Sequence, residues 1–368
     1  MPNQTAPDDL KYMAYALTLA ARGRYTTDPN PNVGCVLVKD GKIIGEGWHE
    51  KAGSAHAEVN ALQQAQEDPQ GSTAYVTLEP CAHHGKTPPC CEALIAAGIS
   101  RLVVAMQDPN PLVAGRGIAR CQSAGIEVIC DVLQKDAQTL NRGFITRMTQ
   151  QRPFIRSKIA MSLDGRTALF NGESQWITSS ASRQDVHDFR AESSAIVTGI
   201  GTVLADNPSL NARVDFPVKQ PVRVVLDSHL RTPPTASICH LEGRTLILTC
   251  AENDKKQTAL SQTGVDVHVL PALNQQLDLH AVMRFLAEQE INTVFIEAGA
   301  TLNGSLLTEN LVDEWIIYLA PSILGNTSRG AFNLPELLAL EHKKTLHWKE
   351  IRRIGDDLRL QLTYSLNT

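Results

Sequence analysis

Three residues near the start of the chain carry side chains of the kinds that bind zinc: His56, Cys81 and Cys90. One imidazole and two thiolates form the ligand set of a catalytic zinc ion, which keeps its fourth position for water. Glu58 follows His56 by two positions, so its carboxylate can remain unligated beside the metal and carry protons for the zinc-bound water. This set predicts a hydrolytic zinc site in which Glu58 is the general acid and base.

The spacing of the two cysteines departs from the usual zinc-deaminase signature, H-x-E followed by P-C-x-x-C. Eight residues separate Cys81 from Cys90, so a loop must bring the second sulfur back beside the first. The Pro88-Pro89 pair suits such a loop, and a helix that begins at Cys90 would stabilise the thiolates. The alternatives are two buried cysteines with a surface histidine, or a structural zinc site closed by a fourth ligand, His83 or His84.

The elements that must position these residues follow an alternating pattern of helices and strands. Two apolar runs around Asp40-Gly41, residues 33–38 and 42–47, predict a β-hairpin. A buried strand over 74–79 delivers Pro80-Cys81 at its end, where α/β sheets place their ligands. Helices are predicted over 10–20, from 55, over 90–97 and near 117–124, and further strands over 101–106 and 126–130. The pattern predicts a three-layer α/β/α domain.

The motifs HAEVNAL and TLEPCAHHGKTPPCCEALI resemble the deaminase half of the bifunctional riboflavin biosynthesis deaminase-reductases, a branch of the cytidine-deaminase-like superfamily. The long loop between the two cysteines is the form found in this branch. The resemblance implies that Asn30, His49 and Lys86 contact the substrate, although a single histidine is more often structural. Arg116 lies in a Pro/Gly-rich loop and could bind a phosphate in a bidentate manner; a solvated loop charge is the alternative.

Strand patterns begin again after a polar stretch that ends at Pro153, and we place the domain boundary near Gln151-Arg152. Apolar runs predict buried strands over 154–160, 195–199, 222–227, 245–250 and 293–297. The strands 195–199 and 293–297 run into glycine-containing turns that open helices, where backbone N–H groups can approach a phosphate. The first turn lacks the third glycine of a dinucleotide-binding fingerprint, so an ordinary strand-to-helix turn is the alternative.

Five motifs of the second half, SLDGRTA, GESQWIT, GIGTVLADNPSLNAR, VVLDS and EAGATLNGSLL, resemble the reductase half of the same family, which has a dihydrofolate-reductase-like α/β fold. The resemblance implies an NADPH site formed by Ala160, Trp176, Thr202, Asp206, Ser228, Gly299, Ala300, Thr301, Leu302, Asn303, Gly304 and Ser305. It also implies a site for the ribose phosphate intermediate formed by Lys158, Ser174, Arg190, Leu210, Arg213 and Glu297. Both halves match in order, which implies a zinc-dependent pyrimidine deaminase domain over 1–151 and an NADPH-dependent reductase domain over 152–368.

The resemblance implies two successive reactions. Zinc-dependent hydrolysis would remove the 2-amino group of 2,5-diamino-6-(5-phosphoribosylamino)pyrimidin-4(3H)-one, with Glu58 carrying protons. NADPH would then reduce the ribosyl chain to ribityl, giving 5-amino-6-(5-phosphoribitylamino)uracil, with Lys158, Asp206 or Glu297 assisting ring opening. The family also implies a homodimer through the reductase domain. Two alternatives stay open: a nucleoside or polynucleotide deaminase with a binding appendage, and a chain whose reductase half has lost its activity.

Charge and composition limit the partners of the chain. The 368 residues carry a net charge of −5, divided into −2 for residues 1–151 and −3 for the remainder, so neither half has the basic excess of a polynucleotide binder. A small-molecule substrate, without nucleic acid, fits better. The eight cysteines have no disulfide-framework spacing, the N-terminus has no signal-peptide pattern, and no apolar run approaches the roughly 20 residues of a membrane span. We therefore expect a cytoplasmic enzyme that does not enter a membrane.

Overall fold

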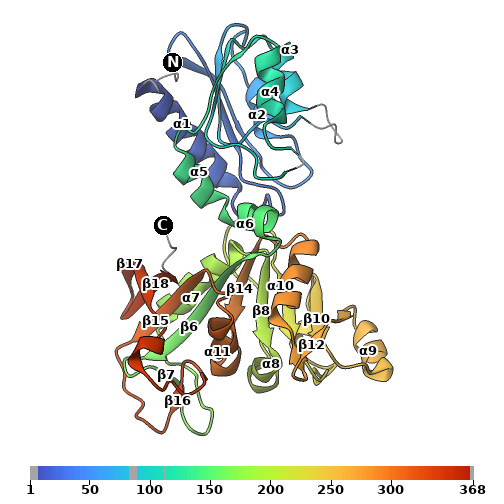
Figure 1. The fold of residues 1–368 in the computed structure, drawn as a ribbon, viewed down its shortest axis with the longest axis vertical. Helices are drawn as coiled ribbons and strands as arrows, with labels where there is room; N and C mark the ends of the chain where they lie inside the picture. Colours follow the sequence, from blue (N-terminus) through green and yellow to red (C-terminus); the bar gives the residue numbers. More distant parts are fainter. Residues whose placement is uncertain (1–6, 83–88, 112, 365–368) are drawn as a thin grey trace. The chain divides into compact units, whose positions relative to one another are not determined.

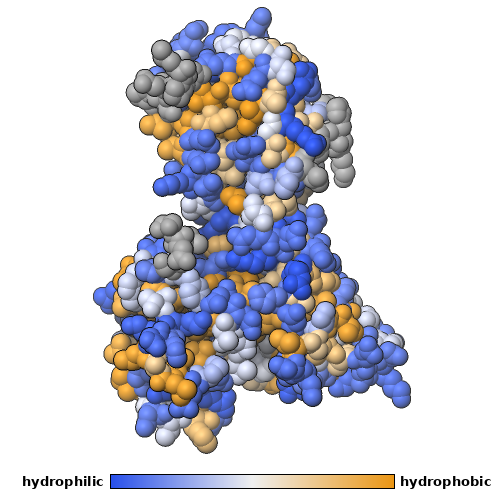
Figure 2. Space-filling model, in the orientation of Figure 1, coloured by the Kyte–Doolittle hydropathy of each residue, from blue (hydrophilic) through white to orange (hydrophobic). Residues whose placement is uncertain are grey.

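The computed structural model describes residues 7–82, 89–111 and 113–364. The chain divides into two compact units, Met1–Gln151 and Arg152–Thr368, and each is described by itself (Figure 1). Within the described ranges, no helix combines the length and the apolar character needed to cross a bilayer. Hydrophilic residues cover much of the face drawn in Figure 2, with hydrophobic residues between them.

A five-stranded sheet forms the centre of the first unit, in the order β2-β1-β3-β4-β5. The strand β1 pairs antiparallel with both β2 and β3, whereas β3, β4 and β5 are parallel. The expected hairpin is therefore formed by β1 and β2. The strands are β1 (Gly34–Lys39), β2 (Lys42–Trp48), β3 (Thr73–Val76), β4 (Arg101–Val104) and β5 (Glu127–Ile129).

Helices pack on both faces of this sheet because its strands carry apolar side chains on both sides. One buried cluster joins Met13 of α1 to Val36 of β1, and a second joins Cys35 of β1 to Ala61 of α2 and Leu94 of α3. Since successive residues of a strand point to opposite faces, Cys35 and Val36 contact different helical layers, which confirms the three-layer α/β/α domain. The helices are α1 (Pro7–Ala20), η1 (Ala21–Gly23), α2 (Ala57–Gln63), α3 (Cys90–Ala96), α4 (Arg116–Ser123), α5 (Gln134–Leu140) and α6 (Arg142–Gln150).

Three parts of this unit differ from the expectations. The helix expected from residue 55 begins at Ala57, and His56 is its N-cap residue with an extended backbone. The strand expected over 74–79 ends at Val76. Beyond it, Thr77 and Glu79 each donate one backbone hydrogen bond, to Gly34 and to Met106. The sequence predicts no helix for α5 and α6, because their composition is largely polar. In the structure, Ala137 of α5 and Ile145 of α6 pack on the core.

A nine-stranded sheet forms the centre of the second unit, in the order β11-β10-β9-β8-β14-β6-β15-β18-β17. The strands from β11 to β15 in this order are parallel, whereas β18 and β17 extend one edge in antiparallel fashion. The strands are β6 (Phe154–Ser162), β8 (Ala195–Gly199), β9 (Val222–Leu226), β10 (Thr245–Thr249), β11 (Asp266–Val269), β14 (Thr293–Glu297), β15 (Glu314–Ala320), β17 (Leu346–Ile354) and β18 (Asp357–Tyr364). Two small sheets pair β12 (Ala272–Leu273) with β13 (Gln276–Leu277) and β7 (Arg166–Ala168) with β16 (Arg329–Gly330).

Helices cover both faces of this sheet as well. Phe295 of β14 packs against Phe189 of α7, whereas its neighbour Ile296 packs with Met283 of α10 and Leu306 of α11. This arrangement confirms an α/β fold for the second unit. The helices are α7 (Ser180–Ala191), α8 (Ile200–Asp206), η2 (Ser237–Cys239), α9 (Asp254–Ser261), α10 (Leu279–Glu288), α11 (Ala300–Thr308) and η3 (Leu340–His342).

Candidate functional site

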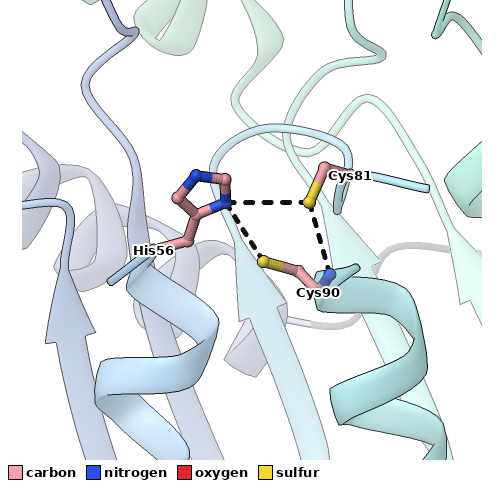
Figure 3. Close-up of side chains that lie close together, drawn as sticks. All are labelled: His56, Cys81 and Cys90. Carbon is pink, nitrogen blue, oxygen red and sulfur yellow. Dashed lines mark hydrogen bonds between the residues drawn. The ribbon is translucent and has the colours of Figure 1, made fainter. Parts of the chain in front are cut away.

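The side chains of His56, Cys81 and Cys90 converge in the first unit (Figure 3). His56 precedes the first turn of α2, Cys81 follows the extended segment after β3, and Cys90 is the first residue of α3. The Nδ1 atom of His56 lies 3.2 Å from Cys90 Sγ and 3.7 Å from Cys81 Sγ. The three ligand atoms all lie within 4.8 Å of one another, so one ion can contact all of them.

The donor atoms of this cluster fit zinc, since one imidazole nitrogen and two sulfurs are the ligands of a catalytic zinc site. Hydrogen bonds from the Cys90 thiol, from His56 and from the Cys90 backbone N–H lower the pKa of Cys81 despite its burial. The hydrogen bond between the Cys90 thiol and Cys81 raises the pKa of Cys90. A bound cation would displace the Cys90 proton. Cys81 is therefore already biased toward the thiolate that binds metal. His83 and His84, the alternative fourth ligands, lie outside the described residues.

Glu58 stands in the first turn of α2, and its side chain is only 3% exposed. Burial raises the pKa of this carboxyl to about 7. A bound zinc ion would lower it again, because a nearby cation stabilises the carboxylate. The buried Glu58 carboxyl is thus an acid-base group placed next to the candidate metal ligands, as hydrolysis requires.

Asn30 and His49, both expected at the substrate site, are joined by a hydrogen bond. His49 Nδ1 lies 3.1 Å from the carbonyl oxygen of Ala55, which can only accept, so this nitrogen carries the proton. Burial lowers the pKa of His49, which favours the neutral ring whose Nε2 accepts from Asn30 Nδ2 at 3.0 Å. The His49 ring also contacts the ring of His56, with centroids 5.4 Å apart. Asn30 is thus held in one orientation near the metal ligands.

The other two residues expected to contact the substrate are Lys86 and Arg116, and the structure describes only Arg116. Lys86 lies outside the described residues, and Arg116 is the first residue of α4, with an exposed side chain. The sequence reasoning missed Glu79, a buried carboxylate that accepts hydrogen bonds from the backbone N–H groups of Gly115 at 2.9 Å and Gly117 at 2.8 Å. The signal that could have found it is a lone carboxylate directly before Pro80-Cys81 at the end of an apolar run.

In the second unit, the structure brings together Lys158, Arg190 and Glu297. Lys158 of β6 and Glu297 of β14 are partners in the parallel register. Arg190 of α7 donates to both carboxylate oxygens of Glu297, at 2.5 and 2.9 Å. Burial lowers the pKa of Lys158. Burial also opposes ionisation of Glu297, but its ion pair with Arg190 outweighs this and lowers its pKa, so a fixed carboxylate lies beside an amine whose proton is held less tightly than usual.

The loop that contains Leu210 and Arg213 is fixed to the same cluster. Arg190 Nη1 donates to the Asn211 carbonyl oxygen at 3.0 Å, and the Arg213 N–H donates to Nδ1 of His187 at 3.1 Å. The Leu210 side chain is 2% exposed and belongs to a buried apolar cluster of the second unit, so it anchors the loop in the core. His187 is a second residue that sequence reasoning left without a role.

Ser174, the remaining residue expected at the reductase substrate site, lies in the loop between β7 and α7. Among the described residues, no hydrogen bond joins Ser174 to Lys158, Arg190 or Glu297.

Two groups of residues expected to line the NADPH site lie where a strand gives way to a helix. Gly199 is the last residue of β8 and the N-cap of α8, and Gly299, two residues after the end of β14, is the N-cap of α11. Both glycine-containing turns thus have the predicted strand-to-helix geometry. The expected residues that are exposed or partly exposed are Ala160, Trp176, Thr202, Asp206, Ser228, Gly299, Ala300, Thr301, Leu302 and Ser305.

Two expected cofactor residues, Asn303 and Gly304, lie on the buried face of α11. Asn303 accepts from the Ser157 hydroxyl at 2.7 Å and donates to the Ala298 carbonyl at 3.0 Å. A Cβ atom at Gly304 would lie 2.0 Å from the backbone oxygen of Asn333. These contacts attach α11 to the sheet and to the segment at Asn333, so Asn303 and Gly304 stabilise the helix that begins after Gly299 and carries Ala300, Thr301, Leu302 and Ser305.

Family descriptions match both units. Residues 6–106 match the cytidine and deoxycytidylate deaminase zinc-binding region, and residues 153–360 match the RibD C-terminal domain. The first match includes all three metal-binding side chains and Glu58, and the second includes the cluster around Glu297.

Similar proteins and structures extend over nearly the whole chain. The riboflavin biosynthesis protein RibD of Escherichia coli (strain K12) is 49% identical over 366 residues, covering 96% of this chain and 99% of that protein. A solved structure of Acinetobacter baumannii RibD (form 2) has a TM-score of 0.89 at 45% identity, covering 96% of this chain and 98% of that one. A diaminohydroxyphosphoribosylaminopyrimidine deaminase/5-amino-6-(5-phosphoribosylamino)uracil reductase from Thermotoga maritima has a TM-score of 0.85 at 33% identity, covering 97% and 98%. The chain therefore belongs to the RibD family of riboflavin biosynthesis proteins.

Proposed function

We propose that the chain is a bifunctional enzyme of riboflavin biosynthesis that uses zinc in its first unit and NADPH in its second. It deaminates 2,5-diamino-6-(5-phosphoribosylamino)pyrimidin-4(3H)-one and then reduces the ribosyl chain of the product, giving 5-amino-6-(5-phosphoribitylamino)uracil. The observation that carries the proposal is the convergence of His56, Cys81 and Cys90 beside the buried Glu58, in a chain that is similar to a riboflavin biosynthesis protein RibD over 96% of its length.

In the deaminase unit, zinc held by His56, Cys81 and Cys90 would activate a water molecule for attack on the carbon that bears the 2-amino group. Glu58 would take up the first proton of this water and deliver it to the ring nitrogen. It would then carry the second proton, from the hydroxyl added to the carbon, to the amino group, which leaves as ammonia. Neutral His49 keeps the Asn30 amide in a fixed orientation toward the substrate. Lys86 and Arg116 complete the proposed set of substrate contacts.

In the reductase unit, NADPH supplies a hydride to C1′ of the sugar. The residues proposed to position the cofactor are Ala160, Trp176, Thr202, Asp206, Ser228, Gly299, Ala300, Thr301, Leu302 and Ser305, and those proposed to hold the intermediate are Lys158, Ser174, Arg190, Leu210, Arg213 and Glu297. Ring opening needs a proton at the ring oxygen. Lys158 is the preferred donor, because burial weakens its hold on the proton and it lies beside Glu297 in the parallel register.

We further propose a cytoplasmic homodimer formed through the reductase unit. Among the described strands, β17 lies at the edge of the nine-stranded sheet next to β18, and it presents Trp348 at 63% and Ile351 at 58% exposure. An edge strand with large exposed apolar side chains is a surface on which a second copy can pair.

The decisive experiment supplies the diaminopyrimidinone nucleotide to the purified chain with and without NADPH and identifies the products by mass. Without NADPH, we expect the deaminated ribosyl compound and one equivalent of ammonia. With NADPH, we expect the ribityl product, two hydrogens heavier. Recovery of unchanged nucleotide in both arms would contradict the proposal.

A further inference from the structure

The buried carboxylate of Glu79 caps the N-terminus of α4 from outside that helix. Its side chain is 4% exposed. Oε1 accepts from the N–H groups of Gly117 at 2.8 Å and Ile118 at 3.3 Å, and Oε2 accepts from Gly115 at 2.9 Å and Asp108 at 3.1 Å. Because the first N–H groups of a helix lack partners and carry partial positive charge, one carboxylate here satisfies donors that the N-cap Gly115 cannot satisfy with a side chain.

The start of α4 is also packed tightly against the segment that carries a metal ligand. A Cβ atom at Gly117 would lie 1.9 Å from the backbone oxygen of Pro80, and Cys81 follows Pro80 directly. On the other side, Arg120 of α4 pairs with Glu92 of α3 at 2.6 Å. Helix α4 is therefore attached by its first turn to the Cys81 segment, and by Arg120 to the helix that begins at Cys90.

We infer that Glu79 is a positioning residue of the deaminase site, which holds Arg116 in place for the phosphate of the substrate. Arg116 stands between Gly115 and Gly117, and the N–H groups of both bind the Glu79 carboxylate. The Arg116 backbone thus cannot shift without breaking one of these bonds. The inference rests on the proposed function, because that function gives Arg116 its role. A residue that acts through Arg116 changes substrate binding, whereas proton transfer belongs to Glu58.

The test measures ammonia release by the full-length zinc-loaded chain at increasing concentrations of the diaminopyrimidinone nucleotide. Glu79→Gln removes the charge and turns an NH₂ group toward backbone donors. We expect KM to rise about tenfold, which corresponds to 1.4 kcal/mol of binding, with kcat changed by less than about threefold. Zinc content and NADPH oxidation with pre-deaminated substrate should stay at wild-type values. Glu67→Gln makes the same change at an exposed residue of the same unit and should leave KM unchanged.

A double-mutant cycle with Arg116→Ala tests whether Glu79 acts through Arg116. Because coupled residues do not add, Glu79→Gln should raise KM little further in the Arg116→Ala background. Equal KM increases in both backgrounds, an unchanged KM in either single variant, or zinc loss from Glu79→Gln would overturn the inference.

Near-ultraviolet circular dichroism shows whether Glu79→Gln is folded. If it is not, the same measurements are made on Glu79→Asp. This variant keeps the charge with a shorter reach, and we expect an intermediate KM. A wild-type chain that releases no ammonia would instead contradict the proposed function itself.

Discussion

Burial shifts the pKa values of two side chains, Glu58 and His187, in opposite directions. It raises the pKa of Glu58 to about 7 and, with help from nearby arginines, lowers the pKa of His187 to about 4. In both cases the charged form loses hydration. Burial thus makes the Glu58 carboxyl hold its proton more tightly, whereas it favours the neutral form of His187, which accepts a hydrogen bond from the Arg213 N–H.

Glu58→Gln is expected to retain zinc and to lose ammonia release. The amide has the shape of the carboxyl but cannot accept and release the proton, and positioned acid-base groups contribute about 10² to 10⁴ in rate. Ammonia release and zinc content are measured on the same preparation. NADPH oxidation with pre-deaminated substrate is the internal control and should continue at the wild-type rate; loss of both activities together would argue against two independent sites.

The second unit should lose stability as the pH falls from about 6.5, the ordinary pKa of histidine, toward 4. The pKa of His187 is lower in the folded chain, so the unfolded chain binds more protons within this window, and the free energy of unfolding falls by at most about 1.4 kcal/mol per pH unit. Urea midpoints of wild type and His187→Asn, measured between pH 7 and 4.5, check this. The variant should lack that part of the slope, whereas His342→Asn, at an exposed site, should keep it.

A buried ion pair between Asp9 and Arg101 attaches helix α1 to the five-stranded sheet. Asp9 of α1 is 1% exposed and binds Arg101 of β4 through two hydrogen bonds, at 2.7 and 2.9 Å. The Tyr75 hydroxyl of β3 donates to the same carboxylate at 3.0 Å. One side chain thus fixes α1 to two strands of the five-stranded sheet.

Asp9→Asn is expected to lower the free energy of unfolding of the first unit by about 1–3 kcal/mol, because it leaves the Arg101 charge without its bidentate partner. The urea midpoint of zinc release reports on this unit. Asp8→Asn is a matched control, since Asp8 is the adjacent residue and is exposed. Equal midpoints for the two variants would contradict the anchoring role of Asp9.

At the scale of the whole molecule, each compact unit contains its own site. The metal ligands and Glu58 all belong to Met1–Gln151, and the cluster of Lys158, Arg190 and Glu297 belongs entirely to Arg152–Thr368. Because no residue is shared, the two activities should be separable by treatments that affect one unit.

Removal of zinc with a chelator is expected to abolish ammonia release and to leave NADPH-dependent reduction of pre-deaminated substrate at its original rate. Readdition of zinc should restore the first activity. Conversely, Asp206→Ala should slow reduction while sparing ammonia release. Both activities are followed in parallel, and a fall in reduction on chelation would show that the units are not independent.

Side-chain types and hydrophobic patterns in the sequence predicted the candidate metal site and the alternating α/β architecture. His56 and the two cysteines are recognisable because few other side chains bind zinc, and Glu58 because its spacing keeps it beside the metal. The apolar runs that became β1, β8 and β14 are also local signals, since a strand buried on both faces must be apolar throughout.

The tertiary structure decided which distant residues meet. Glu79 contacts Gly117, and Lys158 meets Glu297 only through the parallel register of β6 and β14; no local pattern encodes such a register. The role of Asn303 likewise depended on which face of α11 is buried, and α5 and α6 form although their sequences are mainly polar, because tertiary packing outweighs local propensity. Side-chain types state which chemistry is available, whereas long-range packing determines where each group is held.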